Sequence, residues 1–143
     1  MEYIAIITIS ILIIMGLFHF YWAFGGAIGL DKALPTKNGK LLLNPSKTLT
    51  FFVGIILVVF AYIAYIAYTL QFNDFTINEN RNVYVYSGIF LSTVFTFRAI
   101  GEFNAVGFFK KIKNTEFATY DTKYFSPLCL ILGVIFALLA YRV

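Results

Sequence analysis

The chain has 143 residues, of which 60% are apolar, 20% aromatic and only 13% charged. This charged fraction is about half that of an ordinary soluble domain, so a water-soluble globular fold would lack the polar surface to cover it. The single cysteine, Cys129, allows no internal disulfide, and no Cys/His cluster has zinc-site spacing. Glycine-rich nucleotide motifs and the G-x-S-x-G motif of serine hydrolases are also missing, so we expect no cofactor and no metal.

Four apolar segments are long enough to cross a bilayer as helices. They run over residues 3–25, 48–72, 83–104 and 126–141. The fourth begins with Ser126 followed by Pro127, which is typical of a helix N-terminus. A transmembrane barrel needs at least eight strands of about ten residues, which this chain cannot supply. We therefore predict an all-α integral membrane four-helix bundle that forms a single domain over residues 1–143.

The basic residues predict which way the bundle faces. The loops at 31–47 and 103–123 carry four lysines each, whereas the opposite side has only Arg81 and Arg142. The positive-inside rule then places these loops in the cytosol and both termini outside, in a bacterial cytoplasmic membrane. The net charge of +4 is explained by attraction to anionic lipid rather than to nucleic acid. Within the second of these loops, residues 106–117 alternate Phe and Lys, which suits a short amphipathic helix in the interface or a solvated basic loop on the headgroups.

Three ionisable residues inside the predicted spans need an explanation. His19, Arg98 and Glu102 would each cost about 2.5–3.5 kcal/mol at the centre of a membrane helix, so such groups usually face the bundle interior with a partner. Arg98 lies 14 residues after Tyr84, about 21 Å along the helix axis, which places it in the inner third of the bilayer. His19 is expected at the same level. Glu102 follows Arg98 by one helical turn, so we predict an ion pair between them.

The fourth span and the end of the first add polar residues at the same depth. The predicted cluster at the cytosolic face therefore contains His19, Trp22, Arg98, Glu102, Asp121, Ser126 and Cys129. One interpretation is purely structural: the two charged groups neutralise each other, and the imidazole bonds a backbone carbonyl. The other is a pocket that holds an anionic or polar headgroup on Arg98, with His19 and Glu102 available to move protons. Cys129 is expected to be a buried small hydrophobic residue.

Several runs of residues carry a family resemblance. They are residues 19–26 in the first span, Pro35-Thr36, residues 97–110, residues 115–122 and residues 124–129. Over nearly its whole length, the chain resembles a bacterial family named domain of unknown function 3995. In the family pattern an Asp stands where this chain has Glu102, which keeps the carboxylate. The resemblance implies a small four-span membrane protein and no particular activity.

These observations leave three functions open. The first is binding or transport of a lipid or other amphiphile through the Arg98 pocket. The second is a membrane enzyme acting on a lipid or isoprenoid substrate, with His19 as general acid or base and Glu102 orienting a partner. The third is a packing subunit of a membrane complex, suggested by the small-residue stripe of Ala61, Ala64 and Ala67. The expected partners are membrane lipids and an amphiphilic small molecule, with a homo-oligomer left open.

Overall fold

Four long helices dominate the computed structural model, which describes residues 2–38, 40–70 and 74–142. They are α1 (Glu2–Ala23), α3 (Lys47–Leu70), α4 (Asp74–Ile100) and α6 (Ser126–Arg142). The stretches long and apolar enough to cross a membrane are Tyr3–Ala23, Lys47–Thr69, Arg81–Ile100 and Glu116–Arg142. This confirms the predicted all-α membrane protein with four spanning helices.

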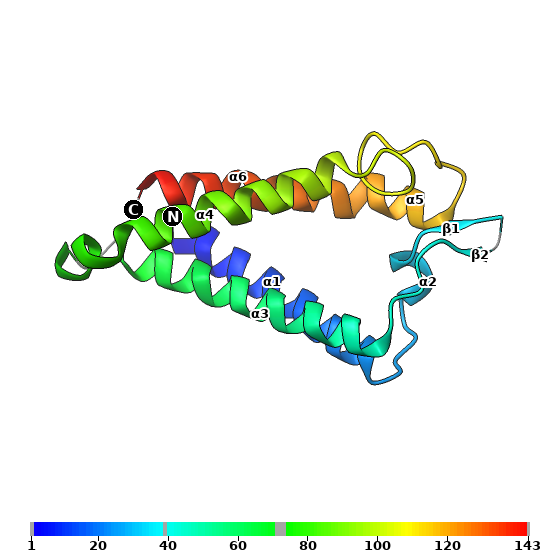
Figure 1. Ribbon diagram of the computed structural model, residues 1–143, viewed down its shortest axis with the longest axis horizontal. Coiled ribbons are helices and arrows are strands. Elements are labelled where there is room, and N and C mark those ends of the chain that lie inside the picture. The colour runs from blue at the N-terminus through cyan, green and yellow to red at the C-terminus, as the bar shows by residue number, and fades with distance from the viewer. Residues whose placement is uncertain (1, 39, 71–73, 143) are drawn as a thin grey trace.

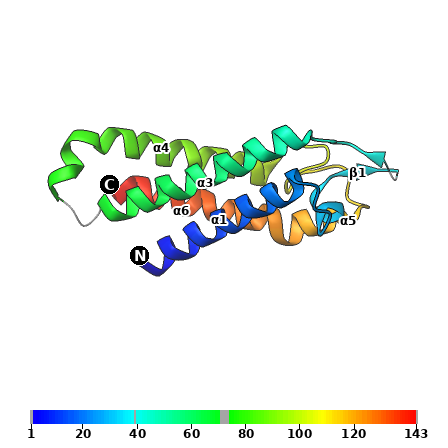
Figure 2. The same ribbon diagram turned by 90° about the horizontal axis from the view of Figure 1, so that it is seen from below.

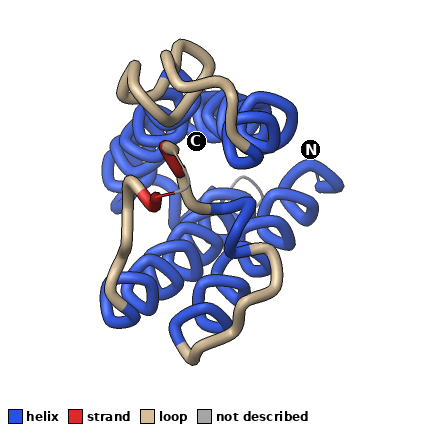
Figure 3. The backbone as a smooth tube through the Cα atoms, turned by 90° about the vertical axis from the view of Figure 1, so that its right-hand side faces the viewer, coloured by secondary structure: helices blue, strands red, loops and turns tan. Residues whose placement is uncertain are grey.

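The helices are arranged as two pairs. Helix α1 packs along α3, and α4 packs along α6, with fewer contacts between the pairs. The pairs lie close together at the end that holds both termini and diverge toward the opposite end, here called the loop end (Figure 1). The view from below places the N- and C-termini together, far from the loops at residues 24–46 and 101–115 (Figure 2). Seen from the loop end, the two helix pairs are separate layers, and loops lie above, between and beside them (Figure 3).

The core uses small residues where helices approach closely, and aromatic rings both within and between the helix pairs. Ala61, Ala64 and Ala67 on α3 are all buried, so the predicted stripe is a packing surface. The ring of Phe95 on α4 stacks on Phe136 of α6 at 5.7 Å, and Phe60 of α3 meets Phe95 edge-on at 6.0 Å. Many large apolar side chains point outward instead, as expected where lipid rather than water surrounds the helices.

The third spanning helix begins earlier and ends earlier than the predicted 83–104. It begins at Asp74, because hydropathy marks the apolar part of a helix and not its polar extension. It ends at Ile100, because Gly101 adopts a left-handed conformation with φ of 88°. A Cβ on Gly101 would collide with the carbonyl of Val106. The end predicted for the second span, at residues 71–72, lies outside the described residues, as does residue 73.

The loop-end connections contain short elements. Between α1 and α3 lie α2 (Leu30–Ala33) and the antiparallel strands β1 (Thr36–Lys37) and β2 (Lys40–Leu41), with Thr36 opposite Leu41. Residues 101–115 form an irregular loop with no helix, so the amphipathic helix considered for 106–117 is not formed there. The backbone N–H groups of Phe108 and Lys111 bond the carbonyls of Ala99 and Asn104 instead.

A short helix follows this loop and leads into the last span. Helix α5 (Glu116–Tyr120) is capped by Thr115, whose hydroxyl accepts a hydrogen bond from the Ala118 N–H at 3.0 Å. A single π-helical turn, η1 (Asp121–Phe125), then joins α5 to α6. Such π-helical turns are rare and often occur at functional sites.

Candidate functional site

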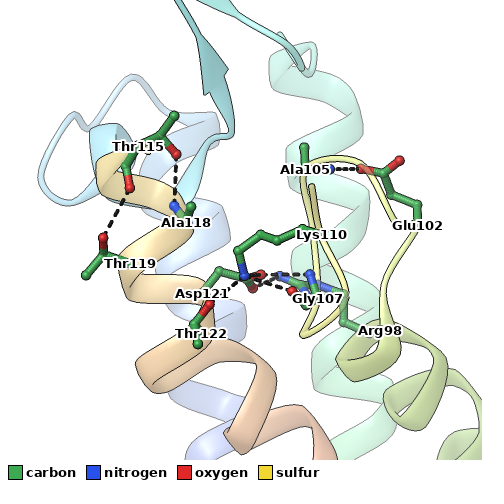
Figure 4. A network of polar contacts seen from close by, with 10 residues as sticks. All are labelled: Arg98, Glu102, Ala105, Gly107, Lys110, Thr115, Ala118, Thr119, Asp121 and Thr122. Atoms are coloured by element: carbon green, nitrogen blue, oxygen red, sulfur yellow. Dashed lines mark hydrogen bonds and ion pairs between the residues drawn. The ribbon is translucent and has the colours of Figure 1, made fainter. Parts of the chain in front are cut away.

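The carboxylate of Asp121 is the centre of a buried polar cluster at the loop end. The residue has no exposed surface. Arg98 Nη2 donates to its Oδ1 at 3.0 Å, while Lys110 Nζ at 3.0 Å and the Gly107 N–H at 2.7 Å donate to its Oδ2. The donors come from the end of α4 and from the loop that follows it, and they converge on the first residue of η1 (Figure 4). We call Arg98, Asp121 and Lys110 the Asp121 triad.

The loop reaches Asp121 because two glycines allow its backbone to fold back on α4. Gly107 has a φ of 88°, and a Cβ on it would collide with the carbonyl of Ile100. This tight return aims the Gly107 N–H at Asp121 and brings Lys110 beside it. Only glycine adopts this conformation without a steric penalty. The two glycines therefore position both donors that the loop contributes.

Lys110 is buried and fully bonded. Its side chain is 1% exposed, and its ammonium donates to the Gly107 carbonyl at 2.7 Å and to Thr122 Oγ1 at 2.7 Å as well as to Asp121. An ammonium group has three N–H donors, so these contacts saturate it. The sequence places Lys110 among basic loop residues, where we expected contact with headgroups. No pattern in the sequence distinguishes it from Lys111 and Lys113, which are both exposed.

Arg98 keeps most of its hydrogen-bonding capacity free. A guanidinium carries five N–H donors, and one hydrogen bond to Asp121 is described for it. Its Nη1 is buried with no hydrogen-bond partner, and so is the hydroxyl of Ser126. The side chain of Arg98 as a whole is 35% exposed, so it stands at the edge of the cluster. With two cations and one carboxylate, the Asp121 triad has an excess of one positive charge.

The predicted ion pair between Arg98 and Glu102 is not formed. The prediction assumed that the helix continues through Glu102, but Gly101 ends it. Glu102 is exposed, and its carboxylate accepts a hydrogen bond from the Ala105 N–H at 2.5 Å within the loop. Figure 4 shows this carboxylate pointing away from Arg98. Asp121, 23 residues after Arg98, supplies the negative charge instead.

His19 and Trp22 belong to the other helix pair. The Nδ1 atom of His19 lies 2.7 Å from the Met15 carbonyl oxygen, one turn earlier on α1, and its ring meets Trp22 edge-on at 5.3 Å. The indole N–H of Trp22 donates to the Ile28 carbonyl at 2.9 Å. Among the described residues, no contact joins either side chain to the Asp121 triad. The structure thus brings Arg98 and Asp121 together, with Ser126 at the end of the π-helical turn that begins at Asp121. It leaves His19 and Trp22 apart from them.

Cys129 lies one turn after Ser126 on α6 and is buried, as expected of a small hydrophobic residue. In the described part of the chain, no group of three His, Cys, Asp or Glu side chains is placed to hold a metal ion.

A weaker polar contact joins the two loops. Lys32 of α2 lies 3.3 Å from Asp31 and 3.8 Å from Glu116 at the start of α5. The hydrogen bond to Asp31, together with the negative charges of Asp31 and Glu116, raises the pKa of Lys32. All three side chains are at least a third exposed, so this bridge adds little to stability.

Comparison with known families agrees with the resemblance noted from the sequence. A family model matches residues 12–136, which include the whole Asp121 triad. The chain belongs to the family described as protein of unknown function (DUF3995). No curated protein and no solved structure matches the chain significantly. The family description names no activity, so a function has to be argued from the Asp121 triad and its surroundings.

Proposed function

We propose that this DUF3995 protein binds an amphiphile with an anionic head group and holds that head group on Arg98. The observation that carries the proposal is the unbalanced charge of the Asp121 triad. Two cations share one carboxylate, Lys110 is saturated, and Arg98 has donors to spare. A ligand that supplies one negative charge would complete the site.

The electrostatics of the site favour an anion. A charge taken out of water is costly unless it is paired and hydrogen-bonded, and the triad leaves one positive charge without a counter-charge. Within the triad, Arg98 is the group that an anion can approach, because its side chain is partly exposed whereas that of Lys110 is not. A guanidinium also matches the planar arrangement of two oxygens in carboxylates and phosphates better than an ammonium does.

The position of Arg98 favours a membrane amphiphile as the ligand. Arg98 lies two residues before the loop end of a helix long and apolar enough to span a membrane. At the end of a membrane span, lipid head groups meet the hydrocarbon layer. By the positive-inside rule this end faces the cytosol, and for a bacterial cytoplasmic membrane the inner leaflet would supply the ligand. Binding there could be the whole function or the first step of transport.

Within the described part of the chain, no contact favours the enzyme alternative. An acid–base mechanism needs groups that reach one substrate, and His19 and Glu102 are each bonded to backbone atoms of their own segments. Among the described residues, no contact connects them. The contacts of the described residues therefore support binding over catalysis.

Native mass spectrometry of the full-length protein, extracted gently with its co-purifying lipid, tests the proposal. We expect bound anionic amphiphile on the wild type and its loss in Arg98→Gln and Arg98→Lys. The second variant keeps the positive charge beside Asp121 while removing the planar donor set. Arg142→Gln, at the opposite end of the bundle, is the matched control and should keep the ligand. Equal ligand occupancy in the wild type and both Arg98 variants would overturn the proposal.

A further inference from the structure

We infer that the head group is a singly charged oxyanion, held between Arg98 Nη1 and the hydroxyl of Ser126. The inference rests on the proposed function and narrows its ligand to one chemical class. It starts from two buried donors that have no partner, a guanidinium nitrogen of Arg98 and the hydroxyl of Ser126, the second of which the anion-binding proposal does not use.

Unpartnered buried donors need an explanation in a folded protein. Most buried polar side-chain atoms have at least one hydrogen-bond partner, and each exception loses its hydration without compensation. Ser126 has no exposed surface, and its hydroxyl does not use a backbone carbonyl of the preceding turn, which is the usual solution for serine in a helix. A partner outside the chain is therefore expected for this hydroxyl and for Arg98 Nη1.

Both donors are connected to the same residue. Arg98 bonds the side chain of Asp121, and the Ser126 backbone N–H bonds the Asp121 carbonyl. Both donors therefore lie beside Asp121, where the end of α4 meets the start of α6. One ligand with two acceptor oxygens satisfies both.

The charge of the triad selects among oxyanions. An excess of one positive charge is neutralised by a phosphodiester or a carboxylate, each of which carries one negative charge. A doubly charged phosphomonoester would leave one negative charge in excess beside the buried Asp121 carboxylate, and like charges at a low-dielectric site repel strongly. The structure therefore favours a singly charged oxyanion over a doubly charged one.

Lipid titrations monitored by native mass spectrometry test the inference on the full chain. The probes are phosphatidylglycerol, phosphatidic acid at a pH where its phosphate is doubly charged, and phosphatidylcholine, which has no net charge. We expect the wild type to bind phosphatidylglycerol most tightly. Ser126→Ala should weaken this binding about tenfold or more, as expected when a hydrogen bond to a charged group is lost.

Ser92→Ala is the matched control. Ser92 is also a spanning-helix serine with no described hydrogen bond, but it lines a separate hollow of about 200 Å³ on α4, together with Thr93, Thr96, Phe97 and Ile100. Arg98 does not line this hollow. The Ser92 variant should bind phosphatidylglycerol as the wild type does.

Competition by free dimethyl phosphate distinguishes two sources of the bound oxyanion, a free anion and a lipid head group. Competition with phosphatidylglycerol at similar concentrations would assign the site to a free oxyanion, whereas competition only at large excess would assign it to a lipid head group. Either result supports the inference if Ser126→Ala abolishes the competition. Unchanged phosphatidylglycerol binding in Ser126→Ala, or tighter binding of phosphatidic acid, would overturn it. The proposed function would survive those results as long as Arg98→Gln still lost the lipid.

Discussion

Replacing Asp121 by asparagine tests whether the Asp121 triad holds the loop end together. The amide has nearly the same shape as the carboxylate, so the change isolates the charge. Asp121→Asn leaves Arg98 and Lys110 as two buried or half-buried cations with no anion between them. It also replaces one carboxylate oxygen with an NH2 group, so either Arg98 or both Lys110 and the Gly107 N–H lose their acceptor.

The expected cost follows from the burial of the partners. Breaking a buried ion pair by removing one partner costs about 3–5 kcal/mol, because the other charge is left uncompensated. Lys110 is 1% exposed and meets this condition fully, whereas Arg98, at 35%, can turn toward water or lipid head groups. We therefore expect Asp121→Asn to lower the free energy of unfolding by about 3 kcal/mol, near the lower end of that range.

The measurement is equilibrium unfolding of the full-length protein in mixed micelles, titrated with a denaturing detergent. Glu116→Gln is the control, because Glu116 is an exposed carboxylate 3.8 Å from Lys32 and should change stability by less than about 1 kcal/mol. Adding Lys110→Met to Asp121→Asn should restore part of the loss, because it removes the cation that the first change left unpaired. Equal stability of Asp121→Asn and Glu116→Gln would refute the reasoning.

Two glycine substitutions test the backbone and helix contacts around the site. Gly107→Ala should destabilise the protein by about 1–3 kcal/mol in the unfolding titration and weaken phosphatidylglycerol binding in the lipid titration. The reason is that a Cβ at a φ of 88° clashes with Ile100 and displaces the loop that donates to Asp121. Full stability in this variant would contradict the account of the loop. Gly133→Leu should cost about 1–3 kcal/mol, because even a Cβ there lies 2.6 Å from Thr96 Oγ1 on α4. The control is Val134→Leu, on the neighbouring exposed residue, and an equal loss in both variants would show that the α4–α6 contact is not responsible.

The number and type of the spanning helices follow directly from composition. Long uncharged apolar stretches can satisfy their backbone groups in lipid only as helices, so their lengths predict four spans. The first and last residues of α4 are harder to predict. Hydropathy detects neither the polar extension at the start of the helix nor the glycine, Gly101, that ends it early. The same glycine decides whether Glu102 shares a helix with Arg98.

The sequence predicts part of the candidate site, namely Arg98 and Asp121, but not Lys110. The cost of burying Arg98 in a spanning helix indicated that it would have a partner, and Asp121 was among the candidates. Lys110 could not be chosen from the sequence, because its burial depends on a loop whose path is set by left-handed glycines rather than by any periodic pattern. His19 was grouped with Arg98 by depth alone, and depth says nothing about which helices pack together.

The choice between the two carboxylates shows what decides such a pairing. Glu102 lies in an exposed loop, where water or head groups can solvate it, so leaving it without a cation costs little. Asp121 lies at the start of the last spanning helix with no exposed surface, so without cations it would carry the full cost of a buried charge. Sequence spacing favours Glu102 as the partner of Arg98, because it is nearer in the chain. Burial favours Asp121, because a buried carboxylate cannot remain unpaired. Because Asp121 takes up one positive charge of the two beside it, the charge left on Arg98 is the feature on which the proposed anion-binding function rests.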